Sequence, residues 1–221
     1  MIIIINKPKG ITSHDVVDVV RKKIGTKKVG HTGTLDPMAK GVLIVLTDED
    51  TKRQREFVGL EKEYVAEIIL GIKTDTFDIE GKILESTNSK IPNLKHTKNR
   101  IKEILQQFLG ETIQIVPVYS AVKIKGKPLY KYVREGKTKD LVLPKRKINI
   151  RKIELFDKYE KDGYPVIKIR VVCSKGTYIR SLANDIGNKL GCGGTLLSLL
   201  RTRVGSYTLE ESVKLEDSVI R

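Results

Sequence analysis

The amino-acid sequence predicts an α+β fold in which helices flank a mixed, multi-stranded sheet. Apolar runs of strand length recur throughout the 221 residues, whereas three segments carry the spacing of an amphipathic helix. Strands and helices are interspersed without the regular alternation of a parallel sheet, which favours α+β architecture. A chain of this length buries roughly 70% of its unfolded surface, so its core needs no disulfide or metal.

The N-terminal region is expected to contain a short strand followed by a helix. Ile2–Ile5 are typical of a buried strand, which Pro8–Gly10 ends. Ser13 is the expected N-cap of a helix that stops at Gly25. The apolar face of this helix consists of Val16, Val17, Val20 and Ile24. Further strands are expected at 42–46, 63–70 and 82–84.

The chain from residue 88 onward is expected to hold a polar loop, two helices and three strands. Residues 88–97 are polar and contain a proline, which indicates a loop. Helical spacing closed by Gly110 predicts a helix whose apolar face is Ile101, Ile104, Leu105, Phe108 and Leu109. Strands are expected at 112–116, 147–159 and 165–173, and a last helix at 178–190.

The charge balance points to a polyanionic partner. Forty-two basic and 27 acidic side chains leave a formal charge of +15. Neutralising phosphates releases counterions, so nucleic acid is the favoured partner. The alternative is a lysine-rich surface, but such surfaces usually carry balancing glutamates. Neither P-loop nor dinucleotide-binding glycine patterns occur, which disfavours a nucleotide-dependent enzyme.

Cysteine and histidine usage predicts neither a disulfide nor a metal site. Cys173 and Cys192 form no CxxC pair, and the three histidines are scattered rather than set at ligand spacing. Both cysteines are expected to be reduced thiols in a cytoplasmic protein. No apolar run approaches the ~20 residues that span a membrane, so a soluble protein without a targeting signal is expected.

The loop Gly30–Pro37 is the strongest candidate for chemistry. Its two glycines permit unusual backbone angles, and Pro37 disfavours a helical conformation at Asp36. The loop leads into the apolar run 42–46, so one carboxylate is presented beside a buried strand. A tight turn with a solvated Asp36 is the alternative for this segment taken alone.

Five ordered motifs resemble the TruB family of tRNA pseudouridine synthases. They are NKPKGITS at 6–13, GHTGTLDP at 30–37, KEY at 62–64, TDT at 74–76 with DIEG at 78–81, and SKGTYIR at 174–180. A looser match runs from 117 to 130. The resemblance covers nearly the whole chain, and it implies the pseudouridine-synthase fold.

The resemblance implies an isomerase that converts uridine 55 in the T-loop of tRNA to pseudouridine. That reaction breaks the C1′–N1 bond and joins C1′ to C5 without metal, redox change or nucleotide cofactor. By resemblance Asp36 is the catalytic carboxylate, acting either as nucleophile or as base. Arg180 lies in the first turn of the last helix, where the macrodipole disfavours a cation. Its implied anionic partner is Asp36, and an exposed arginine contacting a phosphate is the alternative.

The resemblance also implies which side chains hold the extruded base. Tyr64 would stack on the uracil, Tyr178 would place a phenol near it and help remove the C5 proton, and Leu199 would pack on it. Plain packing of Tyr64 and Leu199 in the core is the alternative. Tyr64 and Tyr178 therefore join Asp36 and Arg180 as candidate catalytic residues.

Five candidate substrate-binding residues follow from the resemblance: His31, Leu199, Lys62, Lys7 and Arg201. His31 would occupy the place that the flipped base vacates, or alternatively bond to the backbone of its turn. Lys7 is expected to shape the loop beneath the site more than to touch substrate. Asp75 and Asp78 would hold a hairpin near Tyr64 through bonds to backbone.

The expected organisation is one catalytic domain over residues 1–221. It carries an RNA-clasping insertion at about 85–115 and no C-terminal PUA domain, because only about fourteen residues follow Tyr207. The segment 123–152 is rich in lysine and arginine with tyrosines interleaved, which suits a groove that tracks an RNA backbone, although a solvated lysine face is the alternative.

The sequence therefore predicts a monomeric enzyme that binds the T-stem-loop of tRNA. Two alternatives remain at this point. One is a guide-dependent pseudouridine synthase subunit, and the other is an RNA-binding or RNA-folding chaperone module.

Overall fold

The computed structural model describes residues 1–87, 98–137 and 141–217. The chain divides into two compact units. The first unit comprises Met1–Val65, Val171–Lys175 and Ser198–Arg221, and the second comprises Ala66–Arg170 and Gly176–Leu197. The predicted loop at 88–97 lies outside the described residues. The single domain with an insertion stays a prediction.

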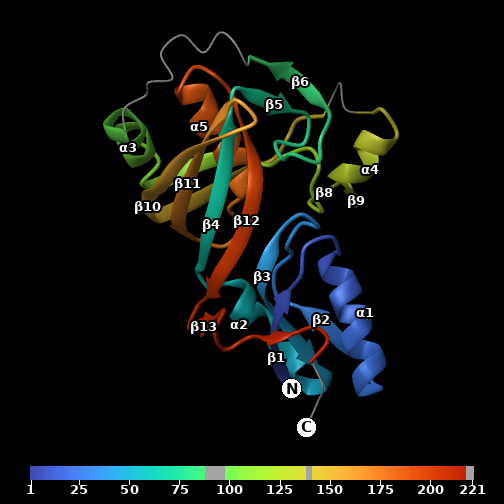
Figure 1. Cartoon of the computed structure of the whole chain (residues 1–221). Coiled ribbons are helices and arrows are strands. Elements are labelled where there is room, and N and C mark those ends of the chain that lie inside the picture. The colour runs from blue at the N-terminus through green and yellow to red at the C-terminus, as the bar shows by residue number, and fades with distance from the viewer. Residues whose placement is uncertain (88–97, 138–140, 218–221) are drawn as a thin grey trace. The chain divides into compact units, whose positions relative to one another are not determined.

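A ten-stranded sheet has the strand order β14-β1-β3-β12-β4-β11-β10-β7, with β2 on β3 and β13 on β12 (Figure 1). Its strands are β1 (Ile2–Lys7), β2 (Val29–His31), β3 (Lys40–Thr47), β4 (Lys62–Leu70), β7 (Gly110–Ile115), β10 (Lys145–Lys161), β11 (Tyr164–Cys173), β12 (Gly194–Val204), β13 (Tyr207–Thr208) and β14 (Val213–Lys214). β1 is antiparallel to β3, whereas β12 is parallel to β3. The sheet is therefore mixed, which confirms the predicted fold class.

The first unit packs helices on both faces of β1 and β3. Helix α1 (Ser13–Ile24) lies on one face, where Val16 and Val20 pack against Ile5, Leu43 and Val45 (Figure 1). The other face of the sheet is covered by α2 (Gln54–Val58), which follows the 3₁₀ helix η1 (Asp48–Arg53). The core cluster on this face of the sheet consists of Val42, Ile44, Leu46, Phe57 and Val204. Because both faces of β3 are covered, its run of apolar residues is continuous rather than alternating.

The start of α1 differs from the prediction. Thr12, not Ser13, is the N-cap: its hydroxyl accepts from Asp15 N, and the Asp15 carboxylate accepts from Thr12 N at 2.7 Å. This is a capping box, in which each residue satisfies a backbone donor of the other. Ser13 Oγ instead donates to Leu35 O at 3.0 Å and accepts from Leu35 N at 2.8 Å. The predicted stop at Gly25 is confirmed, with φ of 72°.

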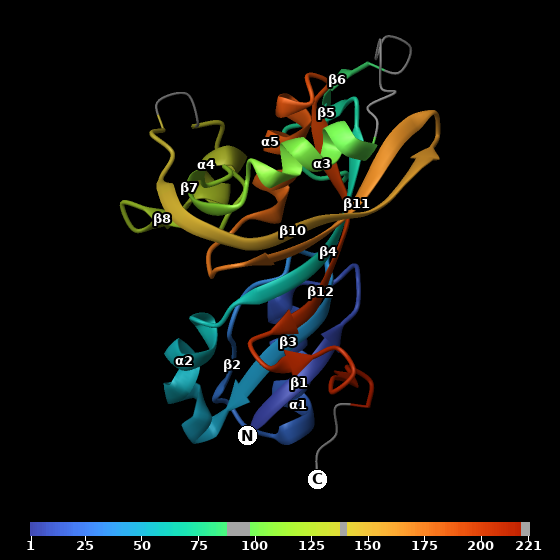
Figure 2. The same cartoon turned by 90° about the vertical axis from the view of Figure 1, so that its left-hand side faces the viewer.

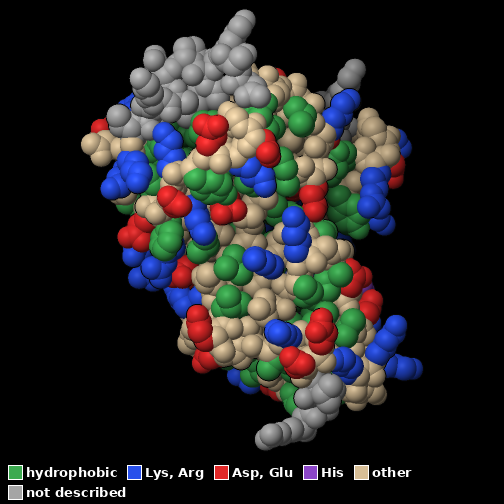
Figure 3. All heavy atoms as spheres, viewed as in Figure 1, with side chains coloured by type: hydrophobic (Ala, Val, Ile, Leu, Met, Phe, Trp, Pro, Cys, Tyr) green, Lys and Arg blue, Asp and Glu red, His purple; other side chains and the backbone are tan. Residues whose placement is uncertain are grey.

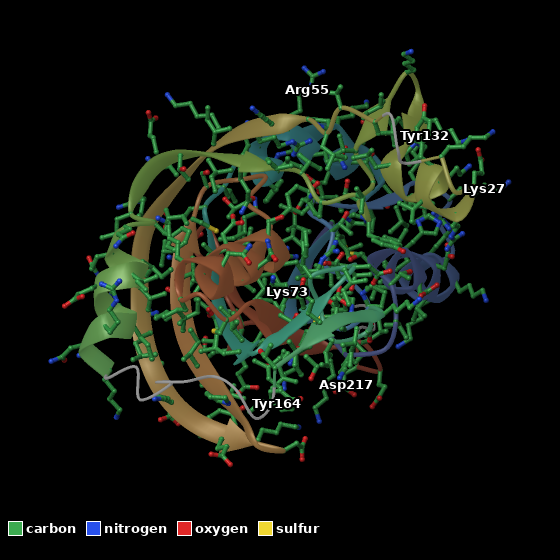
Figure 4. The ribbon with its side chains drawn as sticks, turned by 90° about the horizontal axis from the view of Figure 1, so that it is seen from above. Lys27, Arg55, Lys73, Tyr132, Tyr164 and Asp217 are labelled. Atoms are coloured by element: carbon green, nitrogen blue, oxygen red, sulfur yellow. The ribbon has the colours of Figure 1, made fainter. Side chains whose placement is uncertain are left out.

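The second unit is built around α5 (Ile179–Lys189), whose apolar side is buried. Figures 2 and 4 show β10 curving around this helix. α3 (Lys98–Gln106) lies against β10 and α5, and α4 (Leu129–Arg134) follows two small sheets. Those sheets pair β5 (Ile72–Thr74) with β6 (Ile83–Ser86), and β8 (Lys123–Ile124) with β9 (Lys127–Pro128).

The helix α3 ends earlier than predicted. Its last residue is Gln106, and Leu109 is 41% exposed instead of buried. Gly110, with φ of 86°, begins β7 rather than capping the helix directly. Across the described residues, no helix combines the length and apolarity needed to cross a membrane.

Candidate active site

Asp36 lies on a loop whose backbone is held from several sides. Thr32 N donates to Ile44 O at 3.0 Å, and Ala39 N donates to Asp36 O at 3.0 Å. The two bonds between Ser13 and Leu35 fix the residue directly before Asp36. Leu35 is buried, while Asp36 is half-buried. The chain therefore presents a carboxylate from a rigid backbone without enclosing it fully.

Lys7 anchors the same loop from below. Its side chain is fully buried, and Nζ donates to Pro8 O at 2.9 Å, Pro37 O at 3.4 Å and Ala39 O at 2.7 Å. Pro37 and Ala39 follow Asp36 in the chain, and Pro8 precedes Gly10. The backbone N–H of Gly10 donates to Pro37 O at 2.8 Å. The geometry agrees with a role for Lys7 in shaping the loop.

Tyr64 on β4 is brought close to Asp36 and Arg201. The Tyr64 side chain is buried, and this burial raises the pKa of its phenol. The nearby positive charge of Arg201 opposes that rise in pKa, whereas the negative charge of Asp36 adds to it. The phenol is therefore protonated at neutral pH. Three residues far apart in the sequence form one cluster within the first unit.

Lys62 lies close to Arg201 of this cluster, and both cations are buried. Arg201 is 2% exposed, and its guanidinium donates to Val42 O at 2.7 Å and Gly33 O at 3.0 Å. Lys62 is 6% exposed, and its Nζ donates to Val58 O at 2.8 Å and Leu60 O at 2.6 Å. Burial and the nearby Arg201 charge lower the pKa of Lys62 to about 8.

The lowered pKa of Lys62 predicts how stability depends on pH. Lys62 titrates near 8 in the folded protein and at 10.5 when unfolded, so between these values the unfolded chain binds more protons. The contribution of Lys62 to the free energy of unfolding therefore rises with pH across that window. Relative to Lys62→Met, the wild type should gain about 2–3 kcal/mol between pH 7 and pH 10, from 1.36 kcal/mol per pKa unit. Urea unfolding of both proteins measures this, and a difference independent of pH would contradict it.

His31 and Leu199 complete the predicted residues of the first unit. His31 Nδ1 accepts from Gly33 N at 3.3 Å, and His31 O accepts from Gln54 Nε2 at 3.0 Å. Burial, Arg201 and His14 lower the pKa of His31, so its ring is neutral at pH 7. Leu199 is buried on β12, two residues before Arg201 and hence on the same face of the strand.

Arg180 belongs to the second unit and is buried in the first turn of α5. Its Nη1 donates to Thr76 O at 3.0 Å, Nη2 donates to Tyr119 O at 2.8 Å, and Nε lies 3.6 Å from Asp78 Oδ2. The negative charge of Asp78 offsets the unfavourable helix-dipole position of this guanidinium.

Sequence reasoning found Asp78 as a hairpin residue and missed it as a partner of Arg180. Asp78 is buried, and its Oδ1 accepts from Thr76 Oγ1 at 2.8 Å and from Glu80 N at 3.1 Å. The predicted hairpin role is confirmed, because Asp75 likewise accepts from Lys82 N at 2.8 Å. The sequence feature that indicates such a partner is the position of Arg180 in the first turn of a helix, where a cation is disfavoured unless an anion lies nearby.

Tyr178 is the N-cap residue of α5, and Gln114 holds it there. Gln114 Oε1 accepts from Tyr178 N at 2.8 Å, and Gln114 Nε2 donates to Tyr178 O at 3.0 Å. The Tyr178 side chain is half-buried. The second unit thus brings Tyr178 and Arg180 together at one helix terminus, with Gln114 as a supporting residue that sequence reasoning missed.

The basic segment 123–152 spans β8, β9, α4 and the start of β10. Its tyrosines face cations of the same segment: Lys127 Nζ lies 4.8 Å from the Tyr132 ring centre, and the Arg134 guanidinium carbon lies 5.5 Å from that of Tyr130. Figure 4 shows Tyr132 on α4. In each unit, the face seen in Figure 3 carries Lys and Arg interspersed with Asp and Glu.

In the part of the chain that the structure describes, no group of three or more His, Cys, Asp and Glu side chains is placed to hold a metal ion. The first-unit cluster combines a half-exposed carboxylate with a protonated phenol and buried cations. Such a carboxylate can act as nucleophile or general base, and the phenol offers an aromatic face or a proton donor.

Two family models match the chain. Residues 21–179 match the model described as TruB family pseudouridylate synthase (N terminal domain), and residues 180–218 match the model described as tRNA pseudouridylate synthase B C-terminal domain. Together these matches cover most of the sequence.

Curated relatives named tRNA pseudouridine synthase B are similar over nearly the whole chain. The protein from Carboxydothermus hydrogenoformans is 48% identical over 213 residues, which are 96% of this chain and 72% of the relative. The protein from Clostridium tetani is 46% identical over 98% of this chain and 71% of its own length.

Solved structures share the fold. A Cbf5-Nop10-Gar1 complex contains a chain that is 31% identical with a TM-score of 0.70, and an H/ACA RNP bound to a substrate RNA contains one that is 28% identical with a TM-score of 0.68. Both matches cover 98% of this chain, which spans 52% and 51% of the solved chains.

Proposed function

Because the chain belongs to the TruB family of pseudouridylate synthases, we propose that it isomerises uridine 55 in the T-loop of tRNA to pseudouridine. The observation that carries this proposal is the first-unit cluster, in which Asp36 on its braced loop lies near the Tyr64 phenol and Arg201. The names of the similar proteins supply the substrate class.

Asp36 is the catalytic carboxylate on an extruded uridine. The C1′–N1 bond breaks, the base turns, C1′ bonds to C5, and the proton at C5 leaves while N1 gains one. Tyr64 stacks on the base, a contact worth ~1–3 kcal/mol. Tyr178 and Leu199 also contact the base. Extruding the base from the RNA stack costs a few kcal/mol, and His31 occupies the position that the base leaves. Lys7 shapes the loop.

Following the family pattern, Arg180 provides the positive charge that orients Asp36 and keeps it ionised. A water-excluding pocket by itself would raise the pKa of a carboxyl group. The buried guanidinium of Arg180, whose Nη1 and Nη2 donate to carbonyl groups, is suited to a fixed orienting role.

The test is tritium release from a tRNA transcript labelled at uridine C5, without ATP or metal. Each isomerisation at one site releases one labelled proton, so release should stop at one equivalent per tRNA. A transcript with cytidine at position 55 is the matched control and should release none. Tritium release from both transcripts would contradict the assignment of uridine 55 as the modified nucleotide. Salt-sensitive RNA binding without release would favour the RNA-binding module or a synthase subunit that needs a guide.

A further inference from the structure

Two buried cations, Lys62 and Arg201, lie against the same glycine of the catalytic loop. A Cβ built on Gly33 would lie 3.7 Å from Arg201 Nη1 and 4.0 Å from Lys62 Cε. Arg201 also donates to Gly33 O. Gly33 precedes Asp36 by three residues, so these contacts bear on the position of the carboxylate.

The hydrogen-bond acceptors of both cations are neutral. Lys62 donates to the carbonyls of Val58 and Leu60, at the C-terminal end of α2. Arg201 donates to Val42 O and Gly33 O, and its charge acts on the nearby Tyr64 phenol. Carbonyl dipoles at a helix C-terminus compensate a buried cation only in part.

Lys62 therefore keeps its charge at a cost to stability. The groups acting on it come from several elements: Arg201 on β12 and Lys175 after β11 disfavour the ammonium, and Cys173 on β11 favours it. Burial is the largest influence, and it lowers the pKa. An apolar side chain would avoid this cost, so the charge is retained for a reason other than stability.

Lys62 is also placed to act on Tyr64. The two residues are separated by one position on β4, so both side chains lie on the same face of the strand. Arg201 donates to the Gly33 carbonyl, and its charge lowers the pKa of the nearby Tyr64 phenol. The pair of cations thus connects the base-stacking residue with the loop that carries the carboxylate.

We infer that Lys62 is a positioning residue of the synthase site and does not bind the RNA. Held by its bonds to Val58 O and Leu60 O, the Lys62 side chain packs beside Arg201 against Gly33, and the two together hold the loop of Asp36 against Tyr64. This inference rests on the proposed function. It assigns Lys62 to the carboxylate loop instead of to the substrate.

The test compares Lys62→Met and Lys62→Arg with the wild type, using Lys52→Met as an exposed control lysine. Lys62→Met should lower kcat by about tenfold or more with KM for tRNA within about twofold, because transition-state positioning is lost and RNA contacts remain. Its unfolding midpoint at pH 7 should be unchanged or higher. Lys52→Met should leave kcat and KM unchanged.

The pH profile separates charge from packing. Wild-type kcat should decline above pH 8 as Lys62 loses its proton, and Lys62→Arg should retain activity and lose that alkaline decline, because guanidinium stays protonated. A higher KM with unchanged kcat in Lys62→Met would assign the residue to RNA binding and overturn the inference. A parallel fall of kcat and unfolding midpoint would show a purely structural role, which also overturns it.

A readout on the protein alone keeps this inference separate from the proposed function. In protein labelled with ¹³C at lysine Cε, one resonance should titrate near pH 8 and be missing in Lys62→Met. If all lysines titrate near 10.5, the inference is wrong even when the protein is active. If the titration is seen but the wild type forms no pseudouridine, the proposed function fails and the positioning role fails with it.

Discussion

Asp36→Asn is expected to abolish pseudouridine formation while RNA binding remains. The substitution keeps the size and hydrogen-bonding oxygen of the side chain and removes its negative charge. Because an amide acts neither as nucleophile nor as base, kcat should fall on the order of 10³-fold or more. Hydrogen bonds of the Ser13 hydroxyl and of the Thr32 and Ala39 backbone N–H groups hold the loop independently of the Asp36 side chain, so the fold should be unaffected.

Tritium release and filter binding on the same tRNA transcript measure the two properties separately. RNA affinity should be equal or slightly higher, because one negative charge facing a polyanion is removed. Asp18→Asn, on the exposed side of α1, is the matched control and should keep wild-type turnover. Residual turnover near the wild-type rate in Asp36→Asn would place the chemistry at another residue.

Arg180→Met should impair both stability and turnover. Removing the guanidinium leaves the buried Asp78 carboxylate without this cation, and breaking a buried ion pair from one side costs about 3–5 kcal/mol. The carbonyls of Thr76 and Tyr119 also lose a donor. If Arg180 keeps the catalytic carboxylate ionised, kcat should fall on the order of 10²-fold as well.

The double variant Arg180→Met/Asp78→Asn separates the two effects. Asparagine at position 78 can still accept from Thr76 Oγ1 and Glu80 N, and it carries no charge that needs a cation. Most of the lost free energy of unfolding should return, whereas turnover should stay low. Recovery of turnover together with stability would mean that Arg180 acts only through its pairing with Asp78. Urea unfolding and tritium release on all three proteins decide this.

Strand β12 shows where sequence reasoning failed. Its segment is rich in leucine, which is not typical of strands, and it was not predicted as one. Its place in the sheet, parallel to β3 and next to β4, comes from long-range pairing that no local window contains. This strand carries Leu199 and Arg201, so their surroundings could not be foreseen either.

The start of α1 is a case in which the missing signal was present. Thr12 and Ser13 are adjacent hydroxyl residues, and either can cap a helix. Asp15 stands three residues after Thr12, which is the capping-box spacing that selects Thr12. What no local pattern indicated is that Ser13 would bind Leu35, 22 residues away, beside Asp36.

The sequence by itself determined the fold class, the approximate positions of the longer strands other than β12, and the family, because apolar periodicity and glycine- and proline-rich motifs are local properties. Only the tertiary structure decided that Asp78 pairs with Arg180 and that Lys62 and Arg201 donate to backbone carbonyls. These ion pairs and hydrogen bonds depend on strand register and on which polar side chains are buried next to one another. Both are consequences of packing segments that are distant in the chain, and the electrostatics of the site follow from that packing.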